Sequence, residues 1–127
     1  MEKLRIVVVE DEYYVRKGII QSFDWEKVDC EIVGEAANGK AGIEVVEETK
    51  PDLVIVDVEM PVMDGLCATK EIRRLSRRDA SGIPVIAMTA DAFAEDITVA
   101  MQAGMNAHIA KPIEVQQLYR LIDSFLA

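Results

Sequence analysis

Short apolar runs alternate with stretches of helical periodicity along the whole chain, and this alternation restricts the fold more than any other feature. Each run is four to six residues long and is followed by a segment whose apolar residues recur every three or four positions. The runs occupy residues 6–9, 31–36, 53–56, 85–88 and 107–110. Five such β–α units in one short chain predict a parallel sheet with helices on both faces.

The helical stretches each carry an apolar stripe that should face the sheet. The expected stripes are Val15, Ile19 and Phe23; Ile43 and Val46; Leu66, Ile72 and Leu75; Phe93, Ile97 and Met101; and Leu118, Leu121, Ile122 and Phe125. Asn38-Gly39 predicts a turn or an N-cap before the second helix. Pro51 ends that helix, because proline disfavours helical geometry in the residue before it. Gly104 predicts the C-cap of the fourth helix.

Length and charge narrow the class of protein. The chain has 127 residues, enough for one domain with one sizeable core, and half of them are apolar. The net charge of −9 argues against a direct nucleic-acid partner, which would require a basic face. The first apolar run is too short for a signal peptide or a membrane span. Cys30 and Cys67 are interpreted as two reduced, buried thiols, and we expect a soluble cytoplasmic protein without membrane contact.

Polar residues follow four of the five predicted strands. They are Glu10 and Asp11, Asp57, Thr89 and Lys111. Ligands of such sheets bind outside the carboxyl ends of the strands, so these side chains should meet at one edge. Three adjacent carboxylates repel each other unless a cation or a proton joins them. Because all the acidic ligands are hard oxygens, the pattern favours Mg²⁺, with Mn²⁺ or Ca²⁺ as alternatives, and disfavours Zn²⁺.

The same residues suit phosphoryl transfer. A carboxylate can act as a covalent nucleophile toward phosphorus. The reaction otherwise requires mainly positioning and charge neutralisation. Asp57 with a metal ion, Lys111 and Thr89 would supply this set.

Four motifs follow one another along the chain: VVVEDE at 7–12, PDLVIVDVEMPVMDG at 51–65, PVIAMTA at 84–90 and AKP at 110–112. In this order they resemble the receiver family of two-component response regulators. The resemblance covers essentially the whole chain and implies that residues 1–127 form one receiver domain. It also implies a flavodoxin-like (βα)5 fold, a doubly wound parallel sheet with strand order 2-1-3-4-5.

The resemblance assigns a metal centre. It implies that Asp57 is the phosphorylated residue and also a metal-binding residue, and that Asp11 is a direct Mg²⁺ ligand. Glu10 would act through a metal-bound water, and the backbone carbonyl of Glu59 would be the remaining protein ligand. The family more often has Asp at the position of Glu10, so the reach to the metal water is longer here.

The resemblance also assigns a switch. Thr89 and the backbone of Ala90 would contact the phosphoryl group, Thr89 would move inward on activation, and Lys111 would pair with the phosphoryl group. The Lys111–Pro112 bond is expected to be cis. His108 stands where the family usually has Tyr or Phe, an aromatic side chain that turns inward with the threonine.

The function implied is that of a phospho-acceptor in a phosphorelay. A sensor histidine kinase or a phosphotransfer protein would donate the phosphoryl group, and an output domain or a partner protein would receive the signal. The chain would be a substrate with slow self-dephosphorylation rather than an enzyme. Residues 13–18 and 23–25 look like receivers joined to DNA-binding domains, whereas 88–93 and 111–113 look like receivers of hybrid kinases. A stand-alone regulator, a hybrid kinase and a transcription factor therefore stay open.

Rival functions match poorly. Phosphatases of the haloacid dehalogenase type have their nucleophile near the first strand with Asp two residues later, whereas here Glu59 follows Asp57 after the third strand. A flavodoxin needs a Ser/Thr/Gly-rich phosphate loop after its first strand, where this chain has EDEYY at 10–14. A pseudo-receiver that only binds a partner is the strongest non-catalytic rival, although no site position is lost.

Overall fold

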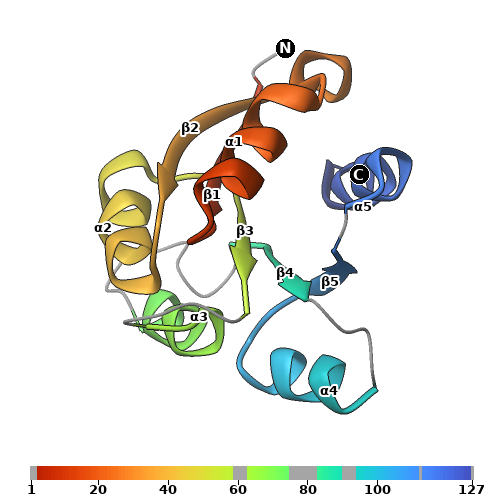
Figure 1. Ribbon diagram of the computed structural model, residues 1–127. Coiled ribbons are helices and arrows are strands. Elements are labelled where there is room, and N and C mark those ends of the chain that lie inside the picture. The colour runs from red at the N-terminus through yellow and green to blue at the C-terminus, as the bar shows by residue number, and fades with distance from the viewer. Residues whose placement is uncertain (1–2, 59–62, 75–82, 90–93, 112, 127) are drawn as a thin grey trace.

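A single five-stranded parallel sheet organises the computed structural model, which describes residues 3–58, 63–74, 83–89, 94–111 and 113–126 (Figure 1). Its strands are β1 (Leu4–Val9), β2 (Cys30–Ala36), β3 (Leu53–Asp57), β4 (Val85–Thr89) and β5 (Ala107–Ala110). The strand order is β2-β1-β3-β4-β5, and all neighbouring pairs are parallel. The predicted flavodoxin-like fold with order 2-1-3-4-5 is therefore confirmed.

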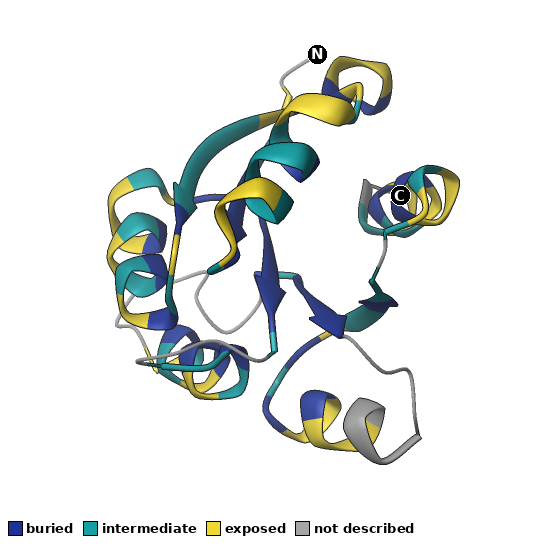
Figure 2. Cartoon of the chain, viewed as in Figure 1, coloured by how far each residue is buried: buried dark blue, intermediate teal, exposed yellow. Residues whose placement is uncertain are grey.

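Helices cover both faces of this sheet. They are α1 (Tyr13–Ser22), α2 (Gly39–Thr49), α3 (Gly65–Arg73), α4 (Ala94–Gln102) and α5 (Val115–Leu126), with a short 3-10 helix η1 (Trp25–Val28). Alternate strand residues enter separate cores. Ile6 and Val8 pack with Ile19 of α1 and residues of α5, whereas Val7 and Val9 pack on the opposite face with residues of α2, α3 and α4. Both faces of the central strands are therefore buried (Figure 2), which explains their continuous apolar runs.

The local signals in the sequence have direct structural counterparts. The Asn38 side chain caps α2 by accepting a hydrogen bond from Ala41 N–H at 2.8 Å. Asp64 caps α3 in the same way, accepting from Cys67 N–H at 2.8 Å. Gly104 follows α4 with a φ of +104°, the left-handed conformation that favours glycine. Among the described residues, no helix combines the length and apolarity needed to cross a bilayer.

Two predictions about burial are wrong. Met101 is 47% exposed, and Ala100 and Ala103 are buried instead. The reason is that residues four apart in an α-helix drift by about 40° per step, so a stripe drawn at that spacing leaves the sheet after two steps. Cys30 is buried as predicted, but Cys67 is exposed because α3 turns Ala68 rather than Cys67 toward the core.

Candidate metal centre

The polar residues predicted at the strand ends meet at one edge of the sheet. Glu10 directly follows β1, Asp57 ends β3, Thr89 ends β4, and Lys111 directly follows β5. These strands are neighbours in the order β1-β3-β4-β5, and all point in the same direction. Parallel pairing therefore brings together side chains as far apart in the sequence as Glu10 and Lys111.

Three carboxylates form the centre of the site. One oxygen each from Glu10, Asp11 and Asp57 lies within 4.8 Å of the others. Glu10 is completely buried, the Asp57 side chain is 8% exposed, and Asp11 is half-buried. Lys111 Nζ lies 2.9 Å from Glu10 Oε2 and 3.0 Å from Asp57 Oδ2. In the described part of the chain one ammonium contacts two of the three carboxylates, so the cluster has an excess of negative charge.

Two buried oxygens at this edge have no hydrogen-bond partner among the described residues, namely Glu10 Oε2 and Thr89 Oγ1. Glu10 Oε2 is nevertheless ion-paired with Lys111 Nζ at 2.9 Å, so Thr89 Oγ1 is the oxygen that lacks a partner in the described part of the chain. Buried polar atoms are normally hydrogen-bonded, so an unpartnered hydroxyl beside a carboxylate cluster indicates a site for a polar or charged ligand. The hard oxygen donors and the excess negative charge fit a divalent cation such as Mg²⁺.

The burial of Glu10 changes its acidity. Burial raises the pKa of Glu10 from 4.5 to about 7, and the negative charge of Asp57 adds to this effect against the opposing contacts with Lys111 and Glu12 N–H. Burial by itself lowers the pKa of Lys111, but its contacts with Glu10 and Asp57 more than offset this, so that its pKa is raised above 10.5. Lys111 therefore stays a cation, and Glu10 takes up a proton as the pH falls through about 7.

This acidity predicts a pH-dependent stability in metal-free buffer. Between 4.5 and about 7 the folded state holds a proton that the unfolded state has lost, so the free energy of unfolding falls as the pH rises through this window. The full loss is about 3 kcal/mol by the linkage relation. Urea denaturation at about pH 5 and about pH 8 with a chelator should measure it.

Glu10→Gln is the control for this prediction. The neutral amide has nearly the same shape and cannot titrate, so its stability should vary less with pH than that of the wild type. Mg²⁺ should restore wild-type stability at about pH 8, since a ligand of the folded state stabilises it. Equal pH slopes for the two proteins would show that Glu10 does not carry the effect.

The remaining predicted residues fall in two groups. Thr89 and His108 are described: the carbonyl of Thr89 accepts a hydrogen bond from Lys111 N–H at 2.8 Å, and His108 is half-buried on β5 opposite Ala87. The predictions for Glu59, Ala90 and the Lys111–Pro112 bond lie outside the described residues.

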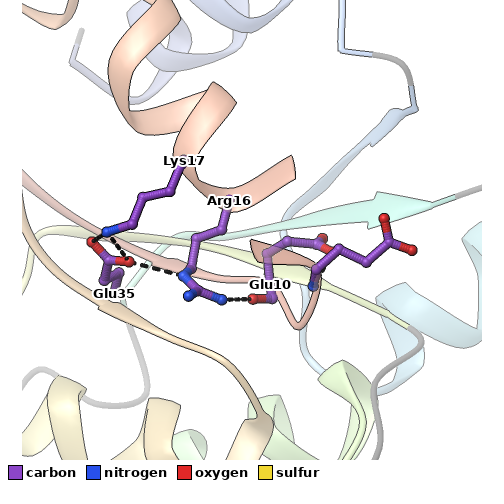
Figure 3. A network of polar contacts seen from close by, with 5 residues as sticks. Glu10, Arg16, Lys17 and Glu35 are labelled. Carbon is purple, nitrogen blue, oxygen red and sulfur yellow. Dashed lines mark hydrogen bonds and ion pairs between the residues drawn. The ribbon is translucent and has the colours of Figure 1, made fainter. Parts of the chain in front are cut away.

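Two neighbours of the site were missed in the sequence. Arg16 donates a hydrogen bond to the backbone carbonyl of Glu10, and Glu35 accepts one from Arg16 (Figure 3). The signal available was an arginine in the helix that directly follows an acidic pair, with an acidic residue near the end of a neighbouring strand. The sequence could not show that these two side chains face each other.

The fold and the acidic edge define a class of doubly wound α/β domains with a metal-binding site at the carboxyl ends of the strands. The chain matches the model of the response regulator receiver domain over residues 6–123, and it belongs to this family. Its sequence is 38% identical over 117 residues to the uncharacterized transcriptional regulatory protein YhcZ of Bacillus subtilis. It is 37% identical over 119 residues to the transcriptional regulatory protein PdtaR of Mycobacterium tuberculosis.

These matches cover 92% and 94% of the chain but only 52% and 55% of the two relatives, so the chain spans about half the length of the curated proteins that it matches. A solved structure covers the chain almost completely. The receiver domain of sensor histidine kinase PA1611 from Pseudomonas aeruginosa is 30% identical, with a TM-score of 0.82 and coverage of 98% of both chains. That domain has a magnesium ion coordinated in its active site cleft.

Proposed function

We propose that this receiver domain, taken as residues 1–127, accepts a phosphoryl group on Asp57. The observation that carries the proposal is the arrangement around this carboxylate. Asp57 is almost buried, it contacts Lys111 at 3.0 Å, and it shares a cluster of three carboxylates with Glu10 and Asp11. A lone buried carboxylate would be a poor acceptor, whereas one beside a cation and a metal site suits phosphoryl transfer.

The proposed reaction is a displacement at phosphorus. A carboxylate oxygen of Asp57 forms a bond to the phosphorus atom of a phosphohistidine, and the phosphorus–nitrogen bond to the imidazole breaks. Lys111 then neutralises the negative charge on the phosphoryl oxygens, and the Thr89 hydroxyl, which has no partner among the described residues, donates a hydrogen bond to one of them. The hydrolysis of the acyl phosphate by water returns Asp57 to its starting state.

The cation site is proposed to hold Mg²⁺, with Mn²⁺ as a substitute. A bound Mg²⁺ supplies positive charge that offsets the repulsion between the carboxylates and the phosphoryl oxygens. Asp11 is the proposed direct ligand because it is the most exposed of the three carboxylates, Glu10 would act through a water, and Glu59 would contribute its carbonyl. The receiver domain of PA1611, which has a magnesium ion coordinated in its active site cleft, supports a magnesium site here by similarity.

Incubation with acetyl phosphate tests the proposal. The intact mass should rise by one phosphoryl group only when Mg²⁺ is present, and hydroxylamine should remove the group because it cleaves acyl phosphates. A chelator should prevent the modification, whereas Mn²⁺ should support it. Modification without metal, or a product that resists hydroxylamine, would contradict an acyl phosphate at this site. A protein that binds beryllofluoride but takes up no phosphoryl group would favour the pseudo-receiver.

The proposed partners follow from the reaction. A sensor histidine kinase or a phosphotransfer protein would provide the phosphohistidine, and an output domain or partner protein would read the phosphorylated state. The chain itself would act as a phosphoryl acceptor with slow self-dephosphorylation. Nucleic acid is not a proposed direct partner of this domain, because its net charge is −9.

A conformational switch is proposed to connect Asp57 to the surface of α4, β5 and α5. Contacts of the phosphoryl group with Thr89 and Lys111 would stabilise only one arrangement, at about 1.5–3 kcal/mol each. Moving an equilibrium from 1:99 to 99:1 requires about 5.5 kcal/mol, so the two contacts lie near this requirement. His108 is smaller than the usual tyrosine and should leave the active state partly populated.

Amide chemical shifts of residues 107–111 measure this population. With beryllofluoride and Mg²⁺, the wild-type resonances should lie between their metal-free positions and those of His108→Tyr, whose larger ring should complete the shift. Identical positions in wild type and His108→Tyr would show that the size of residue 108 has no effect on the switch.

A further inference from the structure

Arg16 connects Glu35, near the end of β2, to Glu10, which directly follows β1 (Figure 3). Its Nε donates a hydrogen bond to Glu35 Oε1 at 2.8 Å, and its Nη1 donates to the backbone carbonyl of Glu10 at 2.7 Å. The Arg16 side chain is only 12% exposed. Two short, charge-assisted hydrogen bonds from a nearly buried guanidinium fix its position well.

A β-bulge in β2 directs the Glu35 side chain toward Arg16. Ile6 pairs with Ile32 but Val7 pairs with Gly34, so the register of β2 shifts by one residue between them. The shift reverses which residues face α1: Ile32 packs in the α1 core before the bulge, and Ala36 packs in the opposite core after it. Glu35 consequently faces α1, as bulges next to functional sites often redirect a side chain.

The last two residues of β2 fix both backbone polar groups of Glu10, its N–H and its carbonyl. Ala36 accepts a hydrogen bond from Glu10 N–H at 3.0 Å, and Glu35 holds the arginine that contacts the Glu10 carbonyl. The latter contact fixes the peptide plane between Glu10 and Asp11. The Asp11 carboxylate forms no hydrogen bond or ion pair with the described part of the chain, so its direction depends on this backbone.

We infer that Arg16 is a positioning residue of the metal centre. Anchored by Glu35, it holds the carbonyl of the Glu10–Asp11 peptide and thereby orients Asp11 toward the cation. The inference rests on the proposed binding of Mg²⁺ by Asp11. Arg16 itself does not touch the cation. It acts as the outer partner of a ligand, the kind of residue whose loss weakens metal binding although the ligands remain.

If Arg16 acted only through its charge, its removal would change the Mg²⁺ affinity in the opposite direction from a loss of positioning. Arg16 is a cation close to the site, and its removal would reduce the repulsion of Mg²⁺ and tighten binding. Loss of positioning would weaken binding. Lys17 provides a matched control, because it is adjacent in sequence and donates to the same Glu35 at 2.8 Å. No hydrogen bond joins Lys17 to the Glu10 carbonyl among the described contacts.

Calorimetric titration with Mg²⁺ and with Ca²⁺ tests the inference. Arg16→Gln should weaken Mg²⁺ binding by about tenfold or more, the usual effect of losing an outer partner. Lys17→Gln should bind as tightly as wild type or slightly more tightly. Ca²⁺ tolerates irregular geometry better than Mg²⁺, so Arg16→Gln should lose less affinity for Ca²⁺. Trp25 lies beside the amino ends of β1 and β2, opposite the site, which makes calorimetry preferable to its fluorescence.

The metal-free proteins give a second measurement. The amide resonances of Asp11 and Glu12 should shift in Arg16→Gln and stay in place in Lys17→Gln, since only the former loses the bond to the Glu10 carbonyl. Arg16→Lys replaces the fork by a compact ammonium that cannot serve both acceptors equally, so it should show the same losses if Arg16→Gln fails to fold.

The outcomes separate the two proposals. Unchanged or tighter Mg²⁺ binding in a folded Arg16 variant would overturn the inference while leaving phosphorylation of Asp57 intact. A wild type that binds Mg²⁺ but takes up no phosphoryl group would overturn the proposed function alone. A wild type without Mg²⁺ affinity would overturn both.

Discussion

Asp57→Asn is expected to take up no phosphoryl group from acetyl phosphate under conditions that modify the wild-type protein. The amide has nearly the same size, so it can still lie beside Lys111 at the end of β3. It lacks the anionic oxygen that attacks phosphorus, and Glu10, the other carboxylate in contact with Lys111, is completely buried. The substitution also removes one of three crowded negative charges, so the variant should fold.

Intact-protein mass spectrometry measures this loss, and Asp52→Asn is its matched control. Asp52 precedes the opposite end of the same strand, where its side chain accepts a hydrogen bond from Arg5 N–H at 2.9 Å. The control should be modified like the wild type. If Asp57→Asn were modified to the same extent as the wild type, another residue would be the acceptor, and fragmentation of the product would identify it.

The sheet edge could be predicted because it depends only on strand direction. Every strand of a parallel sheet delivers its next residue to the same side, so the polar residues after β1, β3, β4 and β5 had to meet. The distribution of burial within the cluster could not be predicted in this way. Glu10 rather than Asp57 proves to be the most deeply buried carboxylate, and its pKa of about 7 follows from this burial.

The alternation of residues along the predicted second strand could not predict that Arg16 pairs with Glu35. Strict alternation along β2 places Glu35 on the same face as Val33, toward α2. The bulge between the partners of Ile6 and Val7 reverses this, and nothing in the alternation of apolar residues marks its place. Irregularities of this kind depend on the packing of the neighbouring strand, so the residues that support a site are harder to predict than the residues that form it.

Gly65→Ala is expected to destabilise the protein strongly, because the first turn of α3 lies against the backbone of the acceptor strand. A β-carbon at Gly65 would collide with the carbonyl oxygen of Asp57 and would lie 2.9 Å from its carbonyl carbon and 3.0 Å from Val58 Cα. These are backbone atoms that cannot rotate away. Gly65 N–H also donates to the Val58 carbonyl at 3.0 Å, which holds the two segments together.

Alanine at Gly18 should instead stabilise the protein. Gly18 lies inside α1, where a β-carbon would meet nothing within 4 Å, and it faces an open groove of about 520 Å³ that extends to Ile113. Gly18→Ala should therefore raise the free energy of unfolding by up to about 1 kcal/mol through helix propensity. Gly65→Ala should lower it by about 3 kcal/mol through overpacking.

Urea denaturation of both variants measures this difference, and labelling with acetyl phosphate shows its consequence for the site. Under conditions in which both variants are folded, Gly65→Ala should be phosphorylated more slowly than wild type, since relief of the collision moves the end of β3 and with it Asp57. Gly18→Ala, whose new β-carbon would meet nothing within 4 Å, should keep the wild-type rate. Equal stability of the two variants would mean that the first turn of α3 can withdraw from the strand at little cost, and that its contact with Asp57 does not hold the acceptor in place.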